Sequence, residues 1–215
     1  MFSLPSRGRP HNLARFLEAY RQTKATAPVR LRLDQDDPDL DSYYAIEIPQ
    51  NWERMARPRS NGANPAHAEL FAEKPDLLWY GLIADDVIPR TPEWDQILID
   101  AAGRDKLAYA DDGFQGEKLA THPVIGGDMV RSIGWLVCPD LGHSYADTAL
   151  HLIAQKTGRC VYRGDVLLEH MHPLANKAQP DKTYRYAEGF VADTQRFHKW
   201  RGMSLRPIVE KLKAA

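Results

Sequence analysis

The chain has 215 residues, enough for one sizeable hydrophobic core, and we expect a single α/β domain with a helical C-terminal extension. Its 28 basic and 29 acidic residues almost cancel, which excludes the global basic field of a protein whose main partner is nucleic acid. Two cysteines are too few for a disulfide framework, and no apolar run approaches the ~20 residues that span a bilayer. We therefore expect a cytoplasmic protein without a transmembrane segment, and peripheral association with a membrane stays open.

Strands and helices are expected to alternate along the first half of the chain. Polar turns separate the apolar segments, and Asn64 followed by Pro65 is typical of a helix start. In chain order we expect a strand at 1–5, a polar turn at 6–10, a helix at 11–22, a strand at 29–33, short strand or loop pieces at 41–48 and 52–55, and a helix at 64–71. This alternation favours a mostly parallel central sheet flanked by helices.

The second half continues with the same kinds of element. In chain order we expect a buried strand at 76–84, a helix at 94–102, a turn at 111–113, a helix at 123–133, a helix at 148–157, strands at 160–162 and 166–172, and a tail helix from 184. The expected organisation is a body at 1–182 and a helical extension at 183–215. Aromatic residues in the tail are expected to pack in a core or an interface, and we give them no chemical role.

The most informative segment is 76–89, an apolar strand that runs directly into Asp85 and Asp86. Ligands of open α/β sheets collect at the carboxyl ends of such strands. The alternative is a solvated turn, but Thr91 and Pro92 already provide a start for the next helix, so capping does not explain the acids. Adjacent carboxylates repel unless a cation or hydrogen-bond donors compensate, so the pair suits a divalent metal that holds a phosphate.

The last predicted strand ends in two histidines, His170 and His172. Alternation along a strand puts both on the same face, so both are expected to reach one site. Imidazole is tolerated better by Mn²⁺ than by Mg²⁺. For each histidine the alternative is a satisfied side chain of the surface or core.

Short motifs follow one another in a definite order between residues 2 and 173. They are residues 4–10 after the first strand, Asp34 after the second, Asn64 at a helix start, residues 83–87, residues 126–128 before a helix, Asp147 before another helix, and residues 170–172. In this order the chain resembles the GT-A glycosyltransferases, especially family 2-like enzymes, which implies one GT-A-like domain with a nucleotide-sugar-binding N-terminal half. One departure is Ala84, which stands where the family has the first Asp of its DxD element. The division of work between Asp85 and Asp86 is therefore open.

The resemblance also implies roles for individual residues. Asp86 would be the main ligand of a divalent cation, Mn²⁺ or Mg²⁺, with His172 as the second protein ligand and His170 as the alternative. Asp147 would be the catalytic base, although Asp is also a favoured helix N-cap residue. The residues implied to bind the nucleotide sugar are Pro5, Ser6, Arg9, Asp34, Asn64, Asp85 and Asp128, and a helix-cap role is equally good for Asp128. Apart from the resemblance, the polar segment 176–184 after the last strand is either a lid that carries Lys177 or Lys182 over the diphosphate or a solvated linker.

The function implied by the resemblance is metal-dependent transfer of a sugar from a nucleoside-diphosphate sugar to a hydroxyl acceptor, with inversion by an Asp base. The sequence leaves open whether the acceptor is a glycan, a lipid-linked sugar or a small molecule. One rival class is a metal-dependent nucleotidyltransferase or phosphoesterase, although the sequence has no Gly-rich phosphate loop. A second rival is a non-catalytic nucleotide-sugar-binding module, which Ala84 keeps open because a fold does not by itself establish activity.

Overall fold

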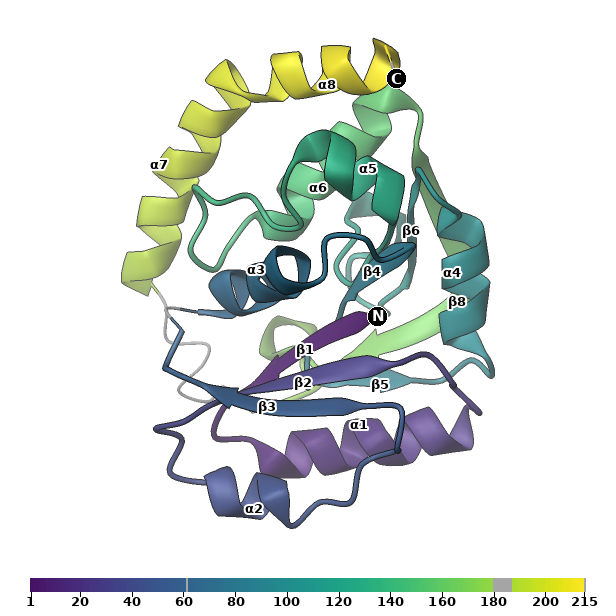
Figure 1. Ribbon diagram of the computed structural model, residues 1–215, viewed down its shortest axis with the longest axis vertical. Coiled ribbons are helices and arrows are strands. Elements are labelled where there is room, and N and C mark those ends of the chain that lie inside the picture. The colour runs from purple at the N-terminus through teal and green to yellow at the C-terminus, as the bar shows by residue number, and fades with distance from the viewer. Residues whose placement is uncertain (61, 180–186, 215) are drawn as a thin grey trace.

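A computed structural model describes residues 1–60, 62–179 and 187–214. In this part of the chain, eight strands form one sheet in the order β3-β2-β1-β4-β7-β6-β8-β5 (Figure 1). The strands are β1 (Phe2–Ser6), β2 (Val29–Asp34), β3 (Glu53–Arg57), β4 (Trp79–Leu82), β5 (Val87–Pro89), β6 (Leu107–Asp111), β7 (Val124–Gly126) and β8 (Cys160–His170). The α-helices are α1 (Pro10–Gln22), α2 (Leu40–Tyr44), α3 (Ala63–Glu73), α4 (Trp94–Ala102), α5 (Gly127–Ile133), α6 (Ala146–Thr157), α7 (Ala187–Met203) and α8 (Leu205–Ala214). Single-turn helices occupy Gly116–Lys118 and Pro173–Ala175.

The sheet is mostly parallel, as the alternation of elements predicts. Six strands share one direction: β1, β2, β3, β4, β6 and β8. The other two, β5 and β7, are antiparallel to their neighbours. We call the end of the sheet where β1, β2 and β4 finish the carboxyl edge. Because β7 is antiparallel to β4, it starts at the carboxyl edge, where Leu82 N donates to Pro123 O at 2.9 Å, and it finishes at the opposite edge.

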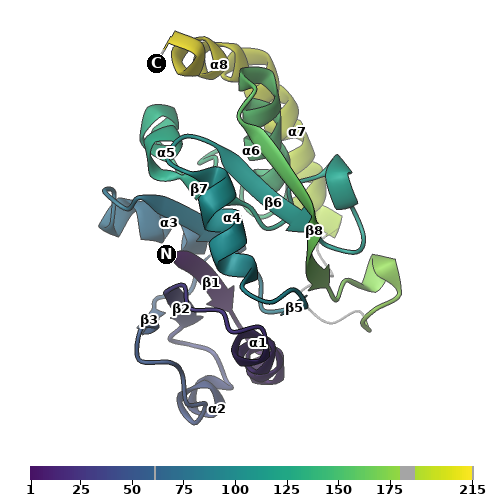
Figure 2. The ribbon, with the colours of Figure 1, turned by 90° about the vertical axis from the view of Figure 1, so that its right-hand side faces the viewer.

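Apolar side chains leave the sheet on both faces and form two cores. Along β6, Leu107 and Tyr109 belong to one core, which we call the first core, whereas Ala108 and Ala110 belong to the other, the second core. Helices α1, α2 and α4 contribute to the second core, and α3, α5, α6, α7 and α8 contribute to the first. Figures 1 and 2 show the sheet between these two groups of helices. The sheet is therefore covered on both faces, and its carboxyl edge is left as the place for a site.

The C-terminal helices pack against the body of the molecule. Phe197 and Trp200 of α7 and Leu205 of α8 are buried in the first core, and both helices lie along the outside of α6 in Figures 1 and 2. The sequence predicts packing for the tail aromatics, and Phe197 and Trp200 confirm it, whereas Phe190 is 51% exposed and Tyr186 lies outside the described residues. None of the helices in the described residues has the length and apolar character needed to span a bilayer.

A buried carboxylate fastens α7 to the loop before α6. Asp193 is 2% exposed, and its carboxylate accepts from the backbone N–H groups of Gly142 at 3.0 Å, His143 at 2.8 Å and Ser144 at 2.8 Å. Burial raises the pKa of Asp193, but these donors and Arg196 outweigh it and hold the pKa below its usual range. The loop that leads into α6 is thereby held in place.

The sequence predictions are wrong for a few local elements. Residues 40–44 form α2 where a short strand or loop is predicted, and Val124 and Ile125 lie in β7 where a helix is predicted. Strand β8 runs without a break through the two strands predicted at 160–162 and 166–172, up to His170. The physical reason at β7 is its place in the sheet: it pairs with both β4 and β6, and its consecutive residues Val124 and Ile125 are buried in different cores, as the alternation of an extended strand requires.

Two glycines follow at the end of β7, where the backbone of neighbouring segments approaches closely. A Cβ at Gly126 would lie 2.1 Å from the carbonyl carbon of Arg104, and a Cβ at Gly127 would lie 2.0 Å from Leu77 O. Neither backbone neighbour moves without displacing its own segment. Only glycine fits at these two positions.

Replacing Gly126 with Ala is therefore expected to destabilise the fold. We expect a loss of at least about 1–3 kcal/mol in the free energy of unfolding, because the added methyl group collides with backbone. Urea unfolding monitored by tryptophan fluorescence measures it. The matched control is Gly202→Ala in α7, where a Cβ meets nothing within 4 Å and stability should be unchanged or slightly raised. Equal stability of Gly126→Ala and wild type would contradict the close approach.

Replacing Asp193 with Asn should cost stability at neutral pH and little at acidic pH. The folded-state pKa of Asp193 is lowered, so its contribution is present above the unfolded-state pKa of about 3.9 and is lost as pH falls through the folded value. We expect a loss of about 1–3 kcal/mol at pH 7. Urea unfolding of variant and wild type at pH 7 and pH 3 measures the difference, with Glu210→Gln on the surface of α8 as the control. A difference that does not shrink at pH 3 would refute this assignment.

Candidate functional site

The candidate site lies at the carboxyl edge, just beyond β4. Asp85 and Asp86 follow this strand, and they are 0% and 6% exposed. The preceding residues Leu82 and Ile83 are buried and fix the backbone from which both carboxylates project. Two adjacent acids are thus held in a largely dry environment, where they require compensation by positive charge or hydrogen-bond donors.

The loop between β1 and α1 provides part of this compensation. Arg9 places Nη2 at 2.7 Å from Asp85 Oδ1 and Nη1 at 3.6 Å from Asp86 Oδ2. Ser6 donates from Oγ to Asp85 Oδ2 at 2.5 Å, and Tyr43 OH lies 2.7 Å from Ser6 Oγ and accepts from Arg9 N at 2.9 Å. Burial raises the pKa of Asp85, against the lowering effect of Arg9. Asp85 therefore mainly holds the loop, and Asp86 is the carboxylate next to open space.

The end of β8 brings two histidines to Asp86. His170 Nε2 lies 3.6 Å from Asp86 Oδ1, and the ring centroids of His170 and His172 are 5.0 Å apart. The backbone supports this approach, because Met171 N donates to Asp86 O at 2.8 Å. The structure therefore brings His170 to Asp86, and His172 lies beside His170, across a long stretch of the chain. That they bind metal remains a prediction.

His170 lies between two carboxylates. Its Nδ1 is 3.9 Å from Oδ2 of Asp112, on the side away from Asp86. Burial lowers the pKa of His170, but Asp112 and Asp86 outweigh it and raise the pKa to about 9. Without a bound cation, the imidazole is positively charged at neutral pH and helps to neutralise both acids.

Asp147 lies on the same side of the molecule, in the first turn of α6. It is partly buried, and its Oδ1 accepts from Thr148 N at 2.6 Å and from Thr148 Oγ1 at 3.2 Å. Burial raises the pKa of Asp147, and the nearby charge of His170 opposes this effect. The N-cap position belongs to Tyr145, which has a left-handed backbone, so Asp147 is not the cap residue.

Some of the predicted nucleotide-binding residues lie near the carboxyl edge, and Asn64 supports a loop instead. Pro5 and Ser6 lie in β1 and Asp34 ends β2, all near the carboxyl edge. Asp34 is engaged by Arg32, by Arg7 at 3.0 Å and by the backbone N–H of Ser60 at 3.1 Å. Asn64 is buried in α3 and donates to Leu141 O at 3.3 Å, so its amide supports the loop before α6.

Asp128 is not brought to the site. It follows β7, whose antiparallel direction carries it to the opposite edge of the sheet. There its carboxylate pairs with Arg104 at 2.8 Å and with Arg131 at 2.5 Å. We therefore leave Asp128 out of the candidate site.

A cavity of about 430 Å³ adjoins Asp86. It lies between the first turns of α1 and the segment 171–179, and the cationic side chains that line it are Arg9, Arg15 and Lys177. Lys177 is tethered at the rim, since its Nζ lies 3.0 Å from Glu169 Oε1 and donates to Gly113 O at 3.2 Å. The cavity thus combines one acid at its base with several cations, a composition that suits an anion bound together with a divalent metal.

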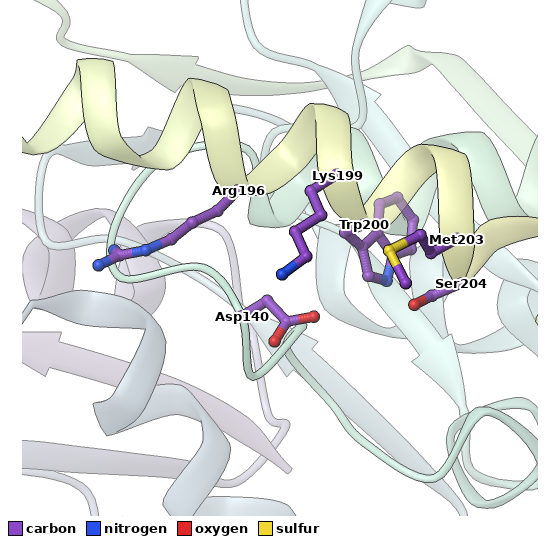
Figure 3. Close-up of a pocket in the computed structure, with 6 residues that line it drawn as sticks. All are labelled: Asp140, Arg196, Lys199, Trp200, Met203 and Ser204. Atoms are coloured by element: carbon purple, nitrogen blue, oxygen red, sulfur yellow. The ribbon is translucent and has the colours of Figure 1, made fainter.

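A second cavity, of about 300 Å³, lies beside α7 (Figure 3). Figure 3 shows Asp140 on a loop opposite Lys199, and the other lining residues are Arg196, Trp200, Met203 and Ser204. None of the predicted site residues lines it, so we do not assign it to the same site.

Two residues of the site have no role in the sequence analysis. Asp112 directly follows β6 and is 1% exposed, and His122 packs edge-on against His170 at a centroid distance of 4.9 Å. Burial lowers the pKa of His122 to about 3, so its ring is neutral. The sequence signal for Asp112 is the same as for Asp85, an acid at the end of an apolar strand, but its following Gly113 also fits a turn. No sequence signal identifies His122.

The residues present fit a divalent cation that takes most of its ligands from a substrate. Among the described residues, no group of three or more His, Cys, Asp or Glu side chains is arranged to hold a metal. However, Asp86 Oδ1 and His170 Nε2 are 3.6 Å apart, which is close enough for both side chains to be ligands of one ion. Cations such as Mg²⁺ are commonly held by one or two protein groups together with phosphate oxygens and waters.

Comparison with known proteins identifies the fold. No protein-family profile and no curated protein sequence matches the chain. Among solved structures, the GalNAc-T7 complex with UDP, GalNAc and Mn²⁺ superimposes with a TM-score of 0.65 at 12% identity, covering 95% of this chain and 48% of that chain. S. aureus TarS gives a TM-score of 0.57 at 11% identity, covering 78% of this chain and 36% of TarS. The CMP:2-keto-3-deoxy-manno-octonic acid synthetase complex with CTP gives 0.50 at 11% identity, covering 82% and 95%.

These similarities define the class of fold. The chain has a GT-A-like fold, which GT-A glycosyltransferases and nucleotidyltransferases both use. It spans less than half the length of GalNAc-T7 and of the matched TarS chain. At such low identity the comparison establishes the fold alone, and the activity has to be argued from the site.

Proposed function

We propose that the protein is a metal-dependent glycosyltransferase that moves a sugar from a nucleoside-diphosphate sugar to a hydroxyl acceptor. The observation that carries this proposal is the meeting of Asp86, His170 and His172 beside a cationic cavity at the carboxyl edge. The GT-A-like fold and the presence of UDP, GalNAc and Mn²⁺ in the GalNAc-T7 structure support it. Mn²⁺ suits a mixed carboxylate and imidazole ligand set better than Mg²⁺ does.

The leaving diphosphate would occupy the 430 Å³ cavity. Arg9 and Arg15 lie at the start of α1, a 13-residue helix whose N-terminal N–H groups add partial positive charge. Lys177 reaches the same cavity from the other side. Together these groups would stabilise the negative charge that develops as the sugar departs.

Asp86, with His170 or His172, would hold a divalent cation, which would supply Lewis-acid stabilisation of the leaving diphosphate. The side chains of this chain would hold and orient it, with Asp86 as the main ligand. Asp85 would contribute indirectly, because its bonds with Ser6 and Arg9 hold the loop that lines the donor pocket.

Asp147 would take the proton from the acceptor hydroxyl. An effective general base has a pKa raised toward the working pH, and burial raises the pKa of Asp147. Attack on the anomeric carbon from the face opposite the diphosphate would invert its configuration. The acceptor would then approach from the side of α6.

The nucleoside would lie against the first strands, with Pro5, Ser6, Arg9, Asp34 and Asn64 around its pocket. Contact between Asp34 and the N–H of a base requires a change at Arg7, which pairs with this carboxylate at 3.0 Å. The acceptor class and a cytoplasmic location, with or without membrane association, remain parts of this proposal.

A nucleotidyltransferase is the second candidate, favoured by the fold similarity to the CTP complex of the synthetase. It would join a nucleoside triphosphate to a sugar or sugar phosphate and release pyrophosphate. A glycosyltransferase would release a nucleoside diphosphate from a nucleotide sugar. A non-catalytic module would bind the nucleotide sugar and release neither product, and a phosphoesterase would release phosphate from model esters without an acceptor.

The first test is metal-dependent ligand binding. A thermal-shift screen of UDP, GDP and their sugar conjugates, with and without Mn²⁺, should find a nucleotide whose stabilising effect requires the metal, because a ligand specific for the folded state raises apparent stability. Asp86→Asn should abolish the metal-dependent part of the shift. Asp128→Asn, at the opposite edge of the sheet, should leave it intact. A shift that survives in Asp86→Asn would remove Asp86 from the metal site.

The second test separates binding from transfer. Asp147→Asn should keep the thermal shift by the nucleotide sugar and lose turnover by at least about 100-fold, the usual size of a general-base contribution. Release of nucleoside diphosphate, measured with a coupled assay and a panel of hydroxyl acceptors, gives the rate. Unchanged turnover in Asp147→Asn would rule it out as the base.

A further inference from the structure

The 300 Å³ cavity beside α7 lies between two segments that are fastened to each other. One wall is α7, and the other is the loop that carries Asp140 and leads into α6 (Figure 3). The carboxylate of Asp193 on α7 accepts from three consecutive N–H groups of this loop, at 2.8 to 3.0 Å. The cavity is therefore preformed, because neither wall moves without breaking this buried contact.

Two groups of opposite charge line this cavity from its two walls. Lys199 extends from α7 toward the loop that carries Asp140 (Figure 3). Both residues are exposed, and in the part of the chain that the structure describes neither side chain has an ion pair or a side-chain hydrogen bond. A ligand between them would therefore meet a donor on one side and an acceptor on the other.

The charges around the cavity cancel. Arg196 is the second cation of the lining, but it pairs at 3.1 Å with Asp193, which is buried. The remaining groups, Asp140 and Lys199, add no net charge. The cavity therefore lacks the excess of positive charge that selects a phosphate, and it also lacks the set of acidic ligands that selects a metal ion.

The rest of the lining is uncharged. It consists of Trp200, which is anchored in the first core, Met203, which is 69% exposed, and Ser204. Small-molecule sites combine such apolar surface with a few polar groups that fix the orientation of the ligand. A hydroxyl group both accepts and donates, so neighbouring hydroxyls of one sugar can bind Lys199 and Asp140 while the C–H groups of its ring pack on Met203. This combination suits a neutral saccharide.

The loop connects this cavity with the proposed acceptor side of the active site. Asp140 precedes Asp147 by seven residues, a length of chain that spans at most roughly 25 Å. Asp147 itself does not line the cavity. A sugar bound here is therefore not the sugar that receives the transferred group, but a glycan of several units can reach both places.

We propose that the cavity beside α7 binds a neutral saccharide unit of a glycan acceptor, with Lys199 and Asp140 as its hydrogen-bonding groups. The inference names the acceptor class that the proposed function leaves open, and its acceptor part rests on that function. Binding of the saccharide itself requires neither a metal ion nor a nucleotide. The site is therefore testable separately from catalysis.

The first experiment uses methionine side chains as reporters. Met203 lines this cavity and Met171 lines the 430 Å³ cavity beside Asp86, so the two sites carry separate probes. Protein labelled with carbon-13 at the methionine methyl groups is titrated with maltotriose, cellotriose, mannotriose and triacetylchitotriose, without metal or nucleotide. Met203→Leu and Met171→Leu assign the two signals. We expect at least one trisaccharide to shift the Met203 signal and to leave the Met171 signal in place. A Met203 signal that none of the four sugars moves would overturn the inference.

Variants of the two charged groups test their role in the same titration. The dissociation constant of the bound trisaccharide should rise roughly 10-fold in Lys199→Ala and in Asp140→Ala, because each variant loses a hydrogen bond to a charged group. It should change by less than about 2-fold in the controls Lys211→Ala on α8 and Asp100→Ala on α4, which are exposed and do not line the cavity. All four substitutions are on the surface, and urea unfolding checks that each variant is folded. Wild-type affinity in both Lys199→Ala and Asp140→Ala would refute the site.

Two smaller probes separate rival ligand chemistries. Glycine carries an ammonium group and a carboxylate that match Asp140 and Lys199, and inorganic phosphate is an anion. Tighter binding of either probe at Met203 than of every trisaccharide would contradict a neutral saccharide as the ligand.

The acceptor role has a readout of its own. Asp86→Asn should bind the trisaccharide with wild-type affinity, because the donor cavity is a different place. With a nucleotide-sugar donor, Lys199→Ala should raise the KM for the trisaccharide acceptor about 10-fold and leave kcat unchanged. An unchanged KM would remove the acceptor role, whereas loss of metal-dependent nucleotide binding by wild type would end the proposed function and leave saccharide binding standing.

Discussion

The burial of two adjacent carboxylates at the end of β4 is the constraint on which the rest of the site depends. Asp85 and Asp86 are almost inaccessible to water, so the fold has to bring positive charge to them. Arg9 arrives from the loop after the first strand, at 2.7 Å from Asp85, and His170 arrives from the end of the last strand, at 3.6 Å from Asp86. The need for charge compensation therefore brings residues that follow the first strand and end the last strand of the chain together beside β4.

The same balance explains why the neighbouring residues are so closely fixed. Ser6 and Tyr43 hold the loop that carries Arg9, and the backbone of His170 is held by Asp112, whose carbonyl oxygen accepts from His170 N at 2.9 Å. Each charged group has a second partner behind it, so the groups that face the cavity have defined orientations. Such support matters for the proposed binding of a cation and a diphosphate, because the orientation of each side chain decides which role it can take.

Much of the fold and part of the site could be predicted from the sequence. The alternation of strands and helices predicted the mostly parallel sheet, and the apolar strand before Asp85 marked the acids at its carboxyl end. The same logic failed at Asp128, since a glycine pair before a helix does not reveal that β7 runs antiparallel and carries this acid to the opposite edge. It also passed over Asp112, because an acid followed by glycine fits an ordinary turn equally well.

The sequence by itself determined which chemical groups stand at strand ends, because apolar periodicity is a local property of the chain. Only the tertiary structure decided which of those ends share an edge, since strand direction and pairing depend on contacts between distant residues. It also decided the difference between His170 and His172. The two residues have the same side chain two positions apart, but one faces the carboxylate of Asp112 and the other faces the backbone N–H of Leu174. That difference in partner lies in three-dimensional packing, which no pattern along the chain contains.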